Sequence, residues 1–108
     1  MKRLLATLAV ALVLPVQAQA PAQPIRIGLI FPLTGGSQDM GNSARVGAQV
    51  AVEEINQVGG YLGRKLELVI RDDEANNDVG LKHTQDLVLK EKVSATIGFC
   101  NTGVAMKS

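Results

Sequence analysis

The sequence contains only one cysteine, Cys100, and one histidine, His83. A single cysteine excludes a disulfide within the chain, and Cys100 has no basic neighbour in the sequence to lower its thiol pKa. We therefore expect Cys100 to be a small buried hydrophobic residue rather than a nucleophile. His83 follows Lys82 in a predicted helix, so we expect a solvated helix position rather than a base or a metal ligand.

Motifs for nucleotide binding and for catalysis are also missing. Gly35-Gly36 and Gly41 lie close together, but neither Gly-x-Gly-x-x-Gly nor a terminal Gly-Lys-Ser/Thr occurs. No set of nucleophile, base and orienting acid can be assembled from this sequence. The sequence therefore predicts a protein that is not an enzyme and that uses no metal or cofactor.

An apolar run at the start of the chain predicts a cleaved export signal. Lys2 and Arg3 precede the stretch Leu4–Leu14, which is too short to cross a bilayer comfortably. Pro15 breaks the stretch, which argues against the alternatives of a membrane anchor and a buried first helix. The small-residue site Ala18-Gln19-Ala20 follows. We expect cleavage after Ala20, so that residues 1–20 are a signal peptide and the mature protein works in a periplasm.

The mature chain predicted in this way begins with an extended leader at residues 21–24, because proline keeps itself and its preceding residue out of a helix. Removing 20 of the 108 residues leaves nine basic and ten acidic side chains, a net charge of −1. This balance gives no sign of binding to nucleic acid or to an acidic membrane surface. A chain of this size can bury one small core, so we expect a single domain at residues 25–108.

Strand and helix patterns alternate along this domain. Ile25–Phe31 is apolar except for Arg26, which is typical of a strand covered on both faces. The predicted elements that follow are a helix capped by Asn42 or Ser43 and ended by Gly59-Gly60, a strand at Lys65–Arg71, a helix capped by Asp78 and ending near Lys92, a strand at Ser94–Phe99 and a helical turn from Val104. Short joints between alternating elements predict an α/β fold, a parallel sheet with flanking helices.

Each predicted helix has an apolar stripe that we expect to face the sheet. The stripe of the first helix consists mostly of small residues, which would let the helix lie close to the strands. The expected inward residues are Ala44, Gly47, Ala48, Ala51, Ile55 and Val58 of the first helix and Leu81, Leu87 and Val88 of the second. The expected outward residues of the first helix are Glu53, Glu54 and Gln57.

Polar loops follow the first and third predicted strands. In parallel α/β sheets, ligands bind at the carboxyl ends of the strands, where loops and helix starts offer unpaired N–H groups. The loops Pro32–Asn42 and Cys100–Gly103 carry the polar side chains Thr34, Ser37, Gln38, Asn42, Asn101 and Thr102. Each of these residues alone is read more simply as a turn or cap residue. Two such loops at one edge nevertheless predict a ligand site.

The pair Asp72-Asp73 ends the second predicted strand. Adjacent carboxylates at a strand end resemble the acidic pair of a receiver domain or a magnesium site, since carboxylate oxygens suit a hard cation. Those domains are cytoplasmic, so the predicted export signal argues against this interpretation. We expect a solvated strand end or a turn and cap role for both residues.

Several short motifs occur in one order along the chain. They are Ile27–Gly35, Gly41, Gly47-Ala48, Ala51–Asn56, Gly59–Arg64, Asp72-Asp73, Ile97-Gly98 and Thr102. In this order they resemble the periplasmic substrate-binding proteins of ABC importers for branched-chain amino acids, the Leu/Ile/Val-binding type. The resemblance runs from Ile25 to about Ala105, and its most specific part is the asparagine, paired glycines and following glycine at 56–63.

This resemblance implies a type I binding protein, in which two Rossmann-like lobes close over a small-molecule ligand and present it to an inner-membrane ABC permease. In that family, a hydroxyl residue four places after the glycine of the third strand holds the ligand's α-carboxylate, and Thr102 has this position relative to Gly98. The loop after the first strand forms a wall of the cleft. The implied ligand-binding residues are Thr102, Asn101, Met40, Asp39 and Gln38. The ligand is then a branched-chain amino acid or a similar carboxylate, with amides, urea and small aromatic acids as alternatives.

The chain lacks the fourth strand and the second lobe that the family uses to enclose its ligand. We therefore expect an N-terminal part of the first lobe, with little or no affinity for a ligand by itself. An uncovered sheet edge and an apolar helix face predict that this fragment either is unstable or self-associates. Two alternatives stay open, the ectodomain module of an exported sensor and a remnant without function.

Overall fold

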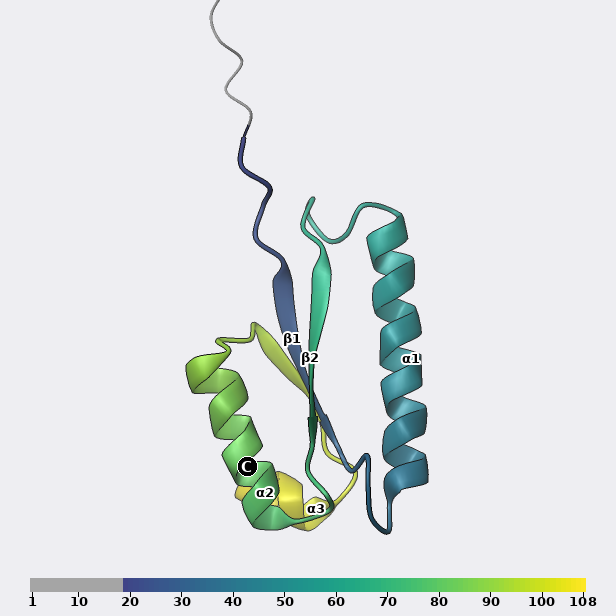
Figure 1. Ribbon diagram of the computed structural model, residues 1–108, viewed down its shortest axis with the longest axis vertical. Coiled ribbons are helices and arrows are strands. Elements are labelled where there is room, and N and C mark those ends of the chain that lie inside the picture. The colour runs from purple at the N-terminus through teal and green to yellow at the C-terminus, as the bar shows by residue number, and fades with distance from the viewer. Residues whose placement is uncertain (1–18) are drawn as a thin grey trace, which may run out of the picture.

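The computed structural model describes residues 19–108, so the predicted signal peptide falls almost wholly outside the described residues. The described chain forms a three-stranded parallel sheet, and its helices lie on both faces (Figure 1). The elements are β1 (Ile25–Phe31), α1 (Gln38–Gln57), β2 (Leu66–Asp72), α2 (Asn77–Gln85), the π-helical turn η1 (Asp86–Lys90), β3 (Ala95–Gly98) and α3 (Thr102–Lys107). α1 covers one face and α2 the other, with α3 packed against α2. The predicted α/β fold is confirmed.

β1 is the central strand and pairs in parallel with β2 on one side and β3 on the other. Leu29 and Ile30 are successive residues, so they face opposite sides of the sheet, and they are only 1% and 0% exposed. Burial on both faces explains why β1 has an almost continuous apolar sequence. Its observed bounds are those predicted.

The hydrophobic core on the α2 face centres on Ile30, Val69 and Leu87, and Val93 and Phe99 pack against this cluster. Leu87 belongs to η1, so the π-helical turn brings the innermost side chain of this face to the sheet. Space for it comes from a missing side chain on β1, because a Cβ on the glycine at 28 would lie 3.0 Å from a Leu87 methyl carbon.

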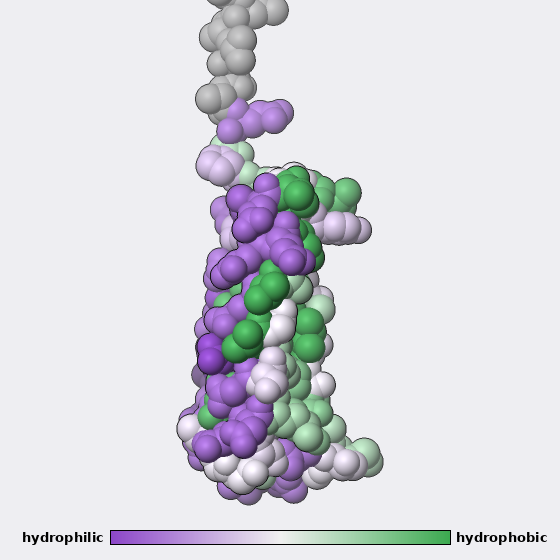
Figure 2. Space-filling model, turned by 90° about the vertical axis from the view of Figure 1, so that its right-hand side faces the viewer, coloured by the Kyte–Doolittle hydropathy of each residue, from purple (hydrophilic) through white to green (hydrophobic). Residues whose placement is uncertain are grey.

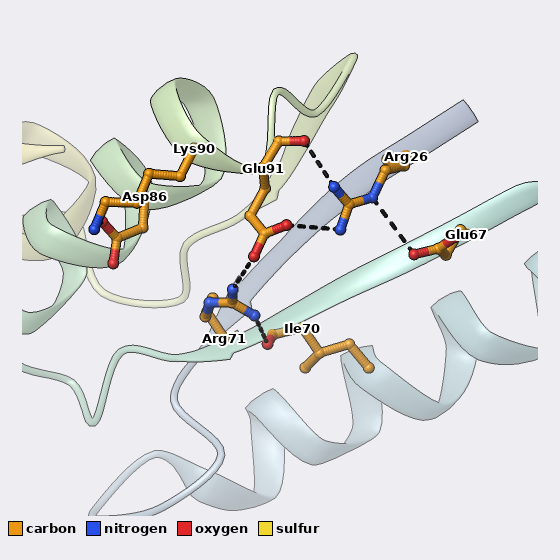
Figure 3. A network of polar contacts seen from close by, with 7 residues as sticks. All are labelled: Arg26, Glu67, Ile70, Arg71, Asp86, Lys90 and Glu91. Carbon is orange, nitrogen blue, oxygen red and sulfur yellow. Dashed lines mark hydrogen bonds and ion pairs between the residues drawn. The ribbon is translucent and has the colours of Figure 1, made fainter. Parts of the chain in front are cut away.

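An ion-pair network joins the residue after η1 to the strands on this face (Figure 3). Glu91 contacts Arg26 of β1 at 2.7 Å and Arg71 of β2 at 2.8 Å, and Arg26 also contacts Glu67 at 3.4 Å. The hydrogen bond from Arg26, with attraction from Arg71, lowers the pKa of Glu91 in spite of partial desolvation. The network links three segments that are distant in sequence, although each partly exposed pair contributes little alone.

The start of α1 differs from the prediction. The helix begins at Gln38, before both predicted caps, and Ser37 holds the N-cap position without a side-chain hydrogen bond. Asn42 lies inside the helix, where its Nδ2 donates to the carbonyl oxygens of Leu33 and Gln38 at 3.0 and 2.9 Å. Asn42 therefore holds the loop after β1 against α1 and does not cap the helix.

The end of α1 is fixed to the start of β2 by Asn56. Its side chain donates to the carbonyl oxygen of Leu66 at 2.9 Å and accepts from the N–H of Leu66 at 2.8 Å. Gly59 and Gly60 then reverse the chain with positive φ angles, as predicted. The side-chain amide of Asn56 thus pairs with the backbone of β2 as a residue of a neighbouring strand would.

The second helical segment also differs from its prediction. Asn76, not Asp78, caps α2, since Asn76 Oδ1 accepts from the N–H groups of Asp78 and Val79 at 2.9 and 3.2 Å. The helix then widens into η1, which changes the residues that face inward. Leu87 is fully buried as predicted, whereas Val88 is 52% exposed, so its predicted inward position is wrong.

α1 leaves part of its apolar surface uncovered, as Figure 2 shows from the side of this helix. Among the predicted inward residues, Ala44 and Ala48 are partly buried, whereas Gly47, Ala51, Ile55 and Val58 are exposed. Val58 is 85% exposed, and Val46 and Val50 are about half exposed. The predicted stripe is therefore partly wrong. Two tertiary contacts, Gly41 against Pro32 and Asn56 on β2, set the rotation of the helix instead.

Gly41→Ala is expected to lower the free energy of unfolding by about 1–3 kcal/mol, because a Cβ there would overlap the backbone carbonyl of Pro32. The matched control is Gly47→Ala in the same helix, where a Cβ meets nothing within 4 Å. That change should stabilise by about 0.5–1 kcal/mol. Urea denaturation followed by circular dichroism measures both, and equal effects of the two substitutions would contradict the close contact.

Candidate functional site

The carboxyl ends of the three strands lie at one edge of the sheet, at the lower end of Figure 1. α1, α2 and α3 all begin at this edge, after loops at 32–37, 73–76 and 99–101. This is the edge at which the sequence predicts a ligand site. No pocket forms within residues 19–108, so the edge is an open surface in this structure.

Asp72 organises the loop that follows β1. One carboxylate oxygen accepts from the Leu33 N–H at 2.8 Å and from the Glu74 N–H at 2.9 Å, and the other accepts from the Thr34 hydroxyl at 2.7 Å. The Thr34 side chain is therefore engaged by Asp72, although it was counted among the polar residues of the predicted site. No local sequence signal pairs these two residues, which are 38 positions apart.

These contacts determine the acidity of Asp72. Burial raises its pKa, but the hydrogen bonds from the Thr34 hydroxyl and from the N–H groups of Glu74, Leu33 and Thr34 outweigh burial, and the pKa lies below its usual value of 3.8. Asp72 is thus held as a charged carboxylate. Its turn role is the one predicted.

Asp73 has a different environment from its neighbour. It is 0% exposed, so the alternative of a solvated strand end is wrong for this residue. The turn role is confirmed, because Asp73 Oδ1 accepts from the Ala75 N–H at 2.9 Å and its carbonyl oxygen accepts from the Asn76 N–H at 2.8 Å. Glu74 and Ala75 both have positive φ, which non-glycine residues rarely adopt, so the two carboxylates support a strained turn.

Three predicted ligand-binding residues, Gln38, Asp39 and Met40, form the first turn of α1 instead of a loop. All three are exposed, and Met40 is 63% exposed. Asp39 lies where a carboxylate is favoured, since the helix amino terminus carries a partial positive charge. Their side chains therefore stand at the predicted edge without enclosing a space.

The other two predicted residues, Asn101 and Thr102, start α3, which begins before the predicted position at Val104. Thr102 is exposed and is the first residue of the helix. Asn101 holds the N-cap position but makes no capping hydrogen bond, and its buried Oδ1 finds no partner among residues 19–108. α3 packs against α2, whereas α1 packs against β1 and β2. The predicted residues of α1 and those of α3 thus lie at the same edge of the sheet, but on helices that pack against different neighbours.

Cys100 and His83 are both partly buried in this part of the molecule. Cys100 is partly buried, and burial, with a further contribution from Asp73, raises the pKa of its thiol. This agrees with the prediction that Cys100 is no nucleophile. His83 is also partly buried, so the predicted solvated position is wrong, and its Nδ1 has no hydrogen-bond partner in the described chain.

No group of three or more His, Cys, Asp or Glu side chains within residues 19–108 is arranged to hold a metal ion. The same residues include no helix of the length and apolar character that a membrane span requires.

Residues 24–108 match the periplasmic binding protein family. The chain belongs to this family. A Leu/Ile/Val-binding protein, BraC3, of Rhizobium johnstonii is 38% identical over 106 residues, which are 98% of this chain and 28% of that protein. A Leu/Ile/Val-binding protein homolog of Brucella melitensis is 36% identical over 82% of this chain and 24% of its own length. The recognised family is therefore confirmed.

Solved structures agree with this assignment. The branched-chain amino acid transporter substrate-binding protein LivJ of Streptococcus pneumoniae, in complex with isoleucine, is 34% identical and superposes with a TM-score of 0.75 over 78% of this chain. A solute-binding protein of an ABC transporter from R. palustris, in complex with benzoate, is 30% identical with a TM-score of 0.69. This chain covers 24% and 23% of those two structures, so it spans about a quarter of the relatives that it matches.

Asp72→Asn is expected to lower the free energy of unfolding at neutral pH by about 1–2 kcal/mol, because the charged acceptor of three backbone N–H groups and one hydroxyl is lost. The folded-state pKa of Asp72 is lowered, so its contribution is present above the usual value of 3.8 and disappears as the pH falls through the folded-state value. Urea denaturation of both proteins at neutral and acid pH measures this. Glu53→Gln, at an exposed position of α1, is the control. A deficit that persists unchanged in acid would contradict the account.

Proposed function

We propose that this chain forms the first part of lobe one of a periplasmic solute-binding protein that serves an ABC importer. Its ligand is a branched-chain amino acid or a similar small carboxylate, which the complete protein delivers to an inner-membrane permease. In this proposal, residues 1–20 are a signal peptide that is cleaved, and residues 25–108 are the segment of lobe one.

The observation that carries this proposal is the likeness, in sequence and in fold, to a binding protein solved with isoleucine. The relative solved with benzoate supports the same chemistry, because isoleucine and benzoate have a carboxylate in common but not an ammonium group. Each superposes on 78% of this chain. We therefore assign recognition of a carboxylate to this segment, and recognition of the rest of the ligand to other parts of the protein.

Thr102 is the residue to which we assign the main ligand contact. Thr102 is an exposed residue at the carboxyl edge of the sheet, next to the half-buried Asn101. A hydroxyl can donate a hydrogen bond to a carboxylate, and such charge-assisted bonds are stronger than neutral ones. Gln38, Asp39 and Met40, exposed in the first turn of α1, form the side wall of the proposed site.

The proposed site is open in this structure, since residues 19–108 form no pocket. Small-molecule sites usually bury most of the surface of their ligand, and hinged binding proteins achieve this by domain closure. We therefore expect the chain alone to contribute contacts to one side of a ligand and to have little affinity by itself.

The test is a chimera in which residues 24–108 replace the matching segment of the Rhizobium johnstonii relative. The chimera should bind leucine, isoleucine or valine in isothermal titration calorimetry. Thr102→Ala should weaken this binding by about 10- to 100-fold, because one hydrogen bond to a charged group is lost. Thr102→Ser should retain most of the affinity.

The matched control is Ser94→Ala, which removes an exposed hydroxyl just before β3, at the opposite edge of the sheet. It should leave the affinity unchanged. A Thr102→Ala chimera that binds as tightly as its parent would refute the role of Thr102. A folded chimera that binds none of the three amino acids would refute branched-chain amino acids as the ligands of this segment. The same titration on the isolated chain should show no measurable binding.

We also propose that the isolated chain self-associates. The apolar side of α1, with Val46, Val50 and Val58, is exposed, and all four residues of the edge strand β3 are exposed. Sedimentation velocity on the samples used for calorimetry should show an average mass that rises with concentration. A monomer at every concentration would contradict this part.

A further inference from the structure

Asp73 is the one buried charged residue of the described core, and the proposed ligand contacts do not use it. Its backbone joins two strands to a helix, because its N–H donates to the carbonyl oxygen of Phe31 at 3.1 Å and its carbonyl oxygen accepts from Asn76, the cap of α2, at 2.8 Å. Only one oxygen of its carboxylate is satisfied, by the Ala75 N–H at 2.9 Å. The other, Oδ2, is buried and has no hydrogen-bond partner within residues 19–108.

Two more unpartnered polar atoms lie in the elements around this turn. They are Nδ1 of His83 on α2 and Oδ1 of Asn101 at the start of α3, and both are buried. The carboxylate oxygen and the amide oxygen are both acceptors. A proton on Asp73 would turn its Oδ2 into a donor, and a buried acceptor without a donor is destabilising.

We propose that Asp73 is a buried proton-binding residue that makes the packing of α2 and α3 at the carboxyl edge of the sheet depend on pH. With its proton bound, Asp73 is neutral and can donate from Oδ2, which suits a side chain that is fully excluded from solvent. Once the proton is lost, a negative charge is buried between β2 and the helices. The helices then move apart or admit water to solvate that charge.

The titratable groups around Asp73 come from three segments. Burial raises the pKa of Asp73 above 3.8, the hydrogen bond from Ala75 opposes this, the neighbouring Asp72 raises it further, and His83 of α2 lowers it. Cys100, after β3, interacts with Asp73 as well, and its own thiol pKa is raised. Lys107 of α3 is engaged with Asp78 and β1 contributes only backbone, so among the side chains around Asp73 it is His83 that lowers the pKa of this carboxyl.

The raised pKa of Asp73 determines how the stability of the fold depends on pH. A group whose folded-state pKa is raised contributes stability that is present below the unfolded value and is lost as the pH rises through the folded value. Asp73 therefore makes the fold less stable as the pH rises above 3.8. Asp72, its neighbour in the same turn, has a lowered pKa and the opposite dependence.

The experiment compares the wild-type chain with Asp73→Asn, a neutral side chain of almost the same shape, in urea denaturation from about pH 4 to about pH 8. The two midpoints should be close in acid, and the variant should become the more stable protein as the pH rises. Asp72→Asn is the matched control and should instead be less stable than wild type by a constant amount over this range, because Asp72 stays ionised above its usual value of 3.8. A wild-type midpoint that tracks that of Asp73→Asn at every pH would overturn the proposal.

A second measurement needs no variant and stands if Asp73→Asn fails to fold. The side-chain carboxyl ¹³C resonance of Asp73 is followed in the wild-type chain as the pH rises. Hydrogen exchange is followed at the Gly80 amide in α2 and the Ala105 amide in α3, which donate to the carbonyl oxygens of Asn76 and Asn101. The carboxyl midpoint should lie above 3.8, and both amides should exchange faster, beyond the intrinsic base dependence, once that midpoint is passed. A midpoint at or below 3.8, or amide protection that ignores the titration, would refute the proposal.

Discussion

The pairing of β1 with both of its neighbours is the constraint on which the rest of this structure depends. β1 supplies Leu29 to the α1 side and Ile30 to the α2 side, and both are almost completely buried. Its parallel register with β2 and β3 brings the carboxyl ends of three strands to one edge. The three helices begin at that edge as a consequence, and every residue of the proposed site lies there.

The two aspartates that end β2 show how one turn serves opposite purposes. Asp72 is kept charged by donors from the loop after β1, and so it holds that loop beside the sheet. Asp73 is buried with an unsatisfied oxygen, and it holds the turn that leads into α2. The site edge is thus built on an ionised carboxylate and on one for which burial favours the neutral form.

Much of the fold could be predicted because its strands are marked by local patterns. The apolar run of β1 and the glycines after α1 mark boundaries by residue type alone, and β2 and β3 start one residue later than predicted. Boundaries and helix faces that depend on other parts of the fold could not be predicted from local patterns. Asn42 looked like a cap but bonds the loop after β1, and η1 turns Val88 outward.

The candidate site could be predicted as a location but not as a shape. The order of strands and helices is enough to place Thr102 and the first turn of α1 at the carboxyl edge. The engagement of Thr34 by Asp72 could not be foreseen, because it joins residues 38 positions apart. Nor could the burial of Asp73 be inferred from an acidic pair that, in sequence, looks solvated.

If the fold depends on β1, this strand should be the most protected part of residues 19–108, and amide hydrogen exchange on the isolated chain measures this protection. Leu29 and Ile30 should exchange slowest, since their strand is paired on both sides and buried on both faces. The amides of β3, at the sheet edge, should exchange faster. Equal or faster exchange in β1 than in β3 would show that the fold does not depend on β1.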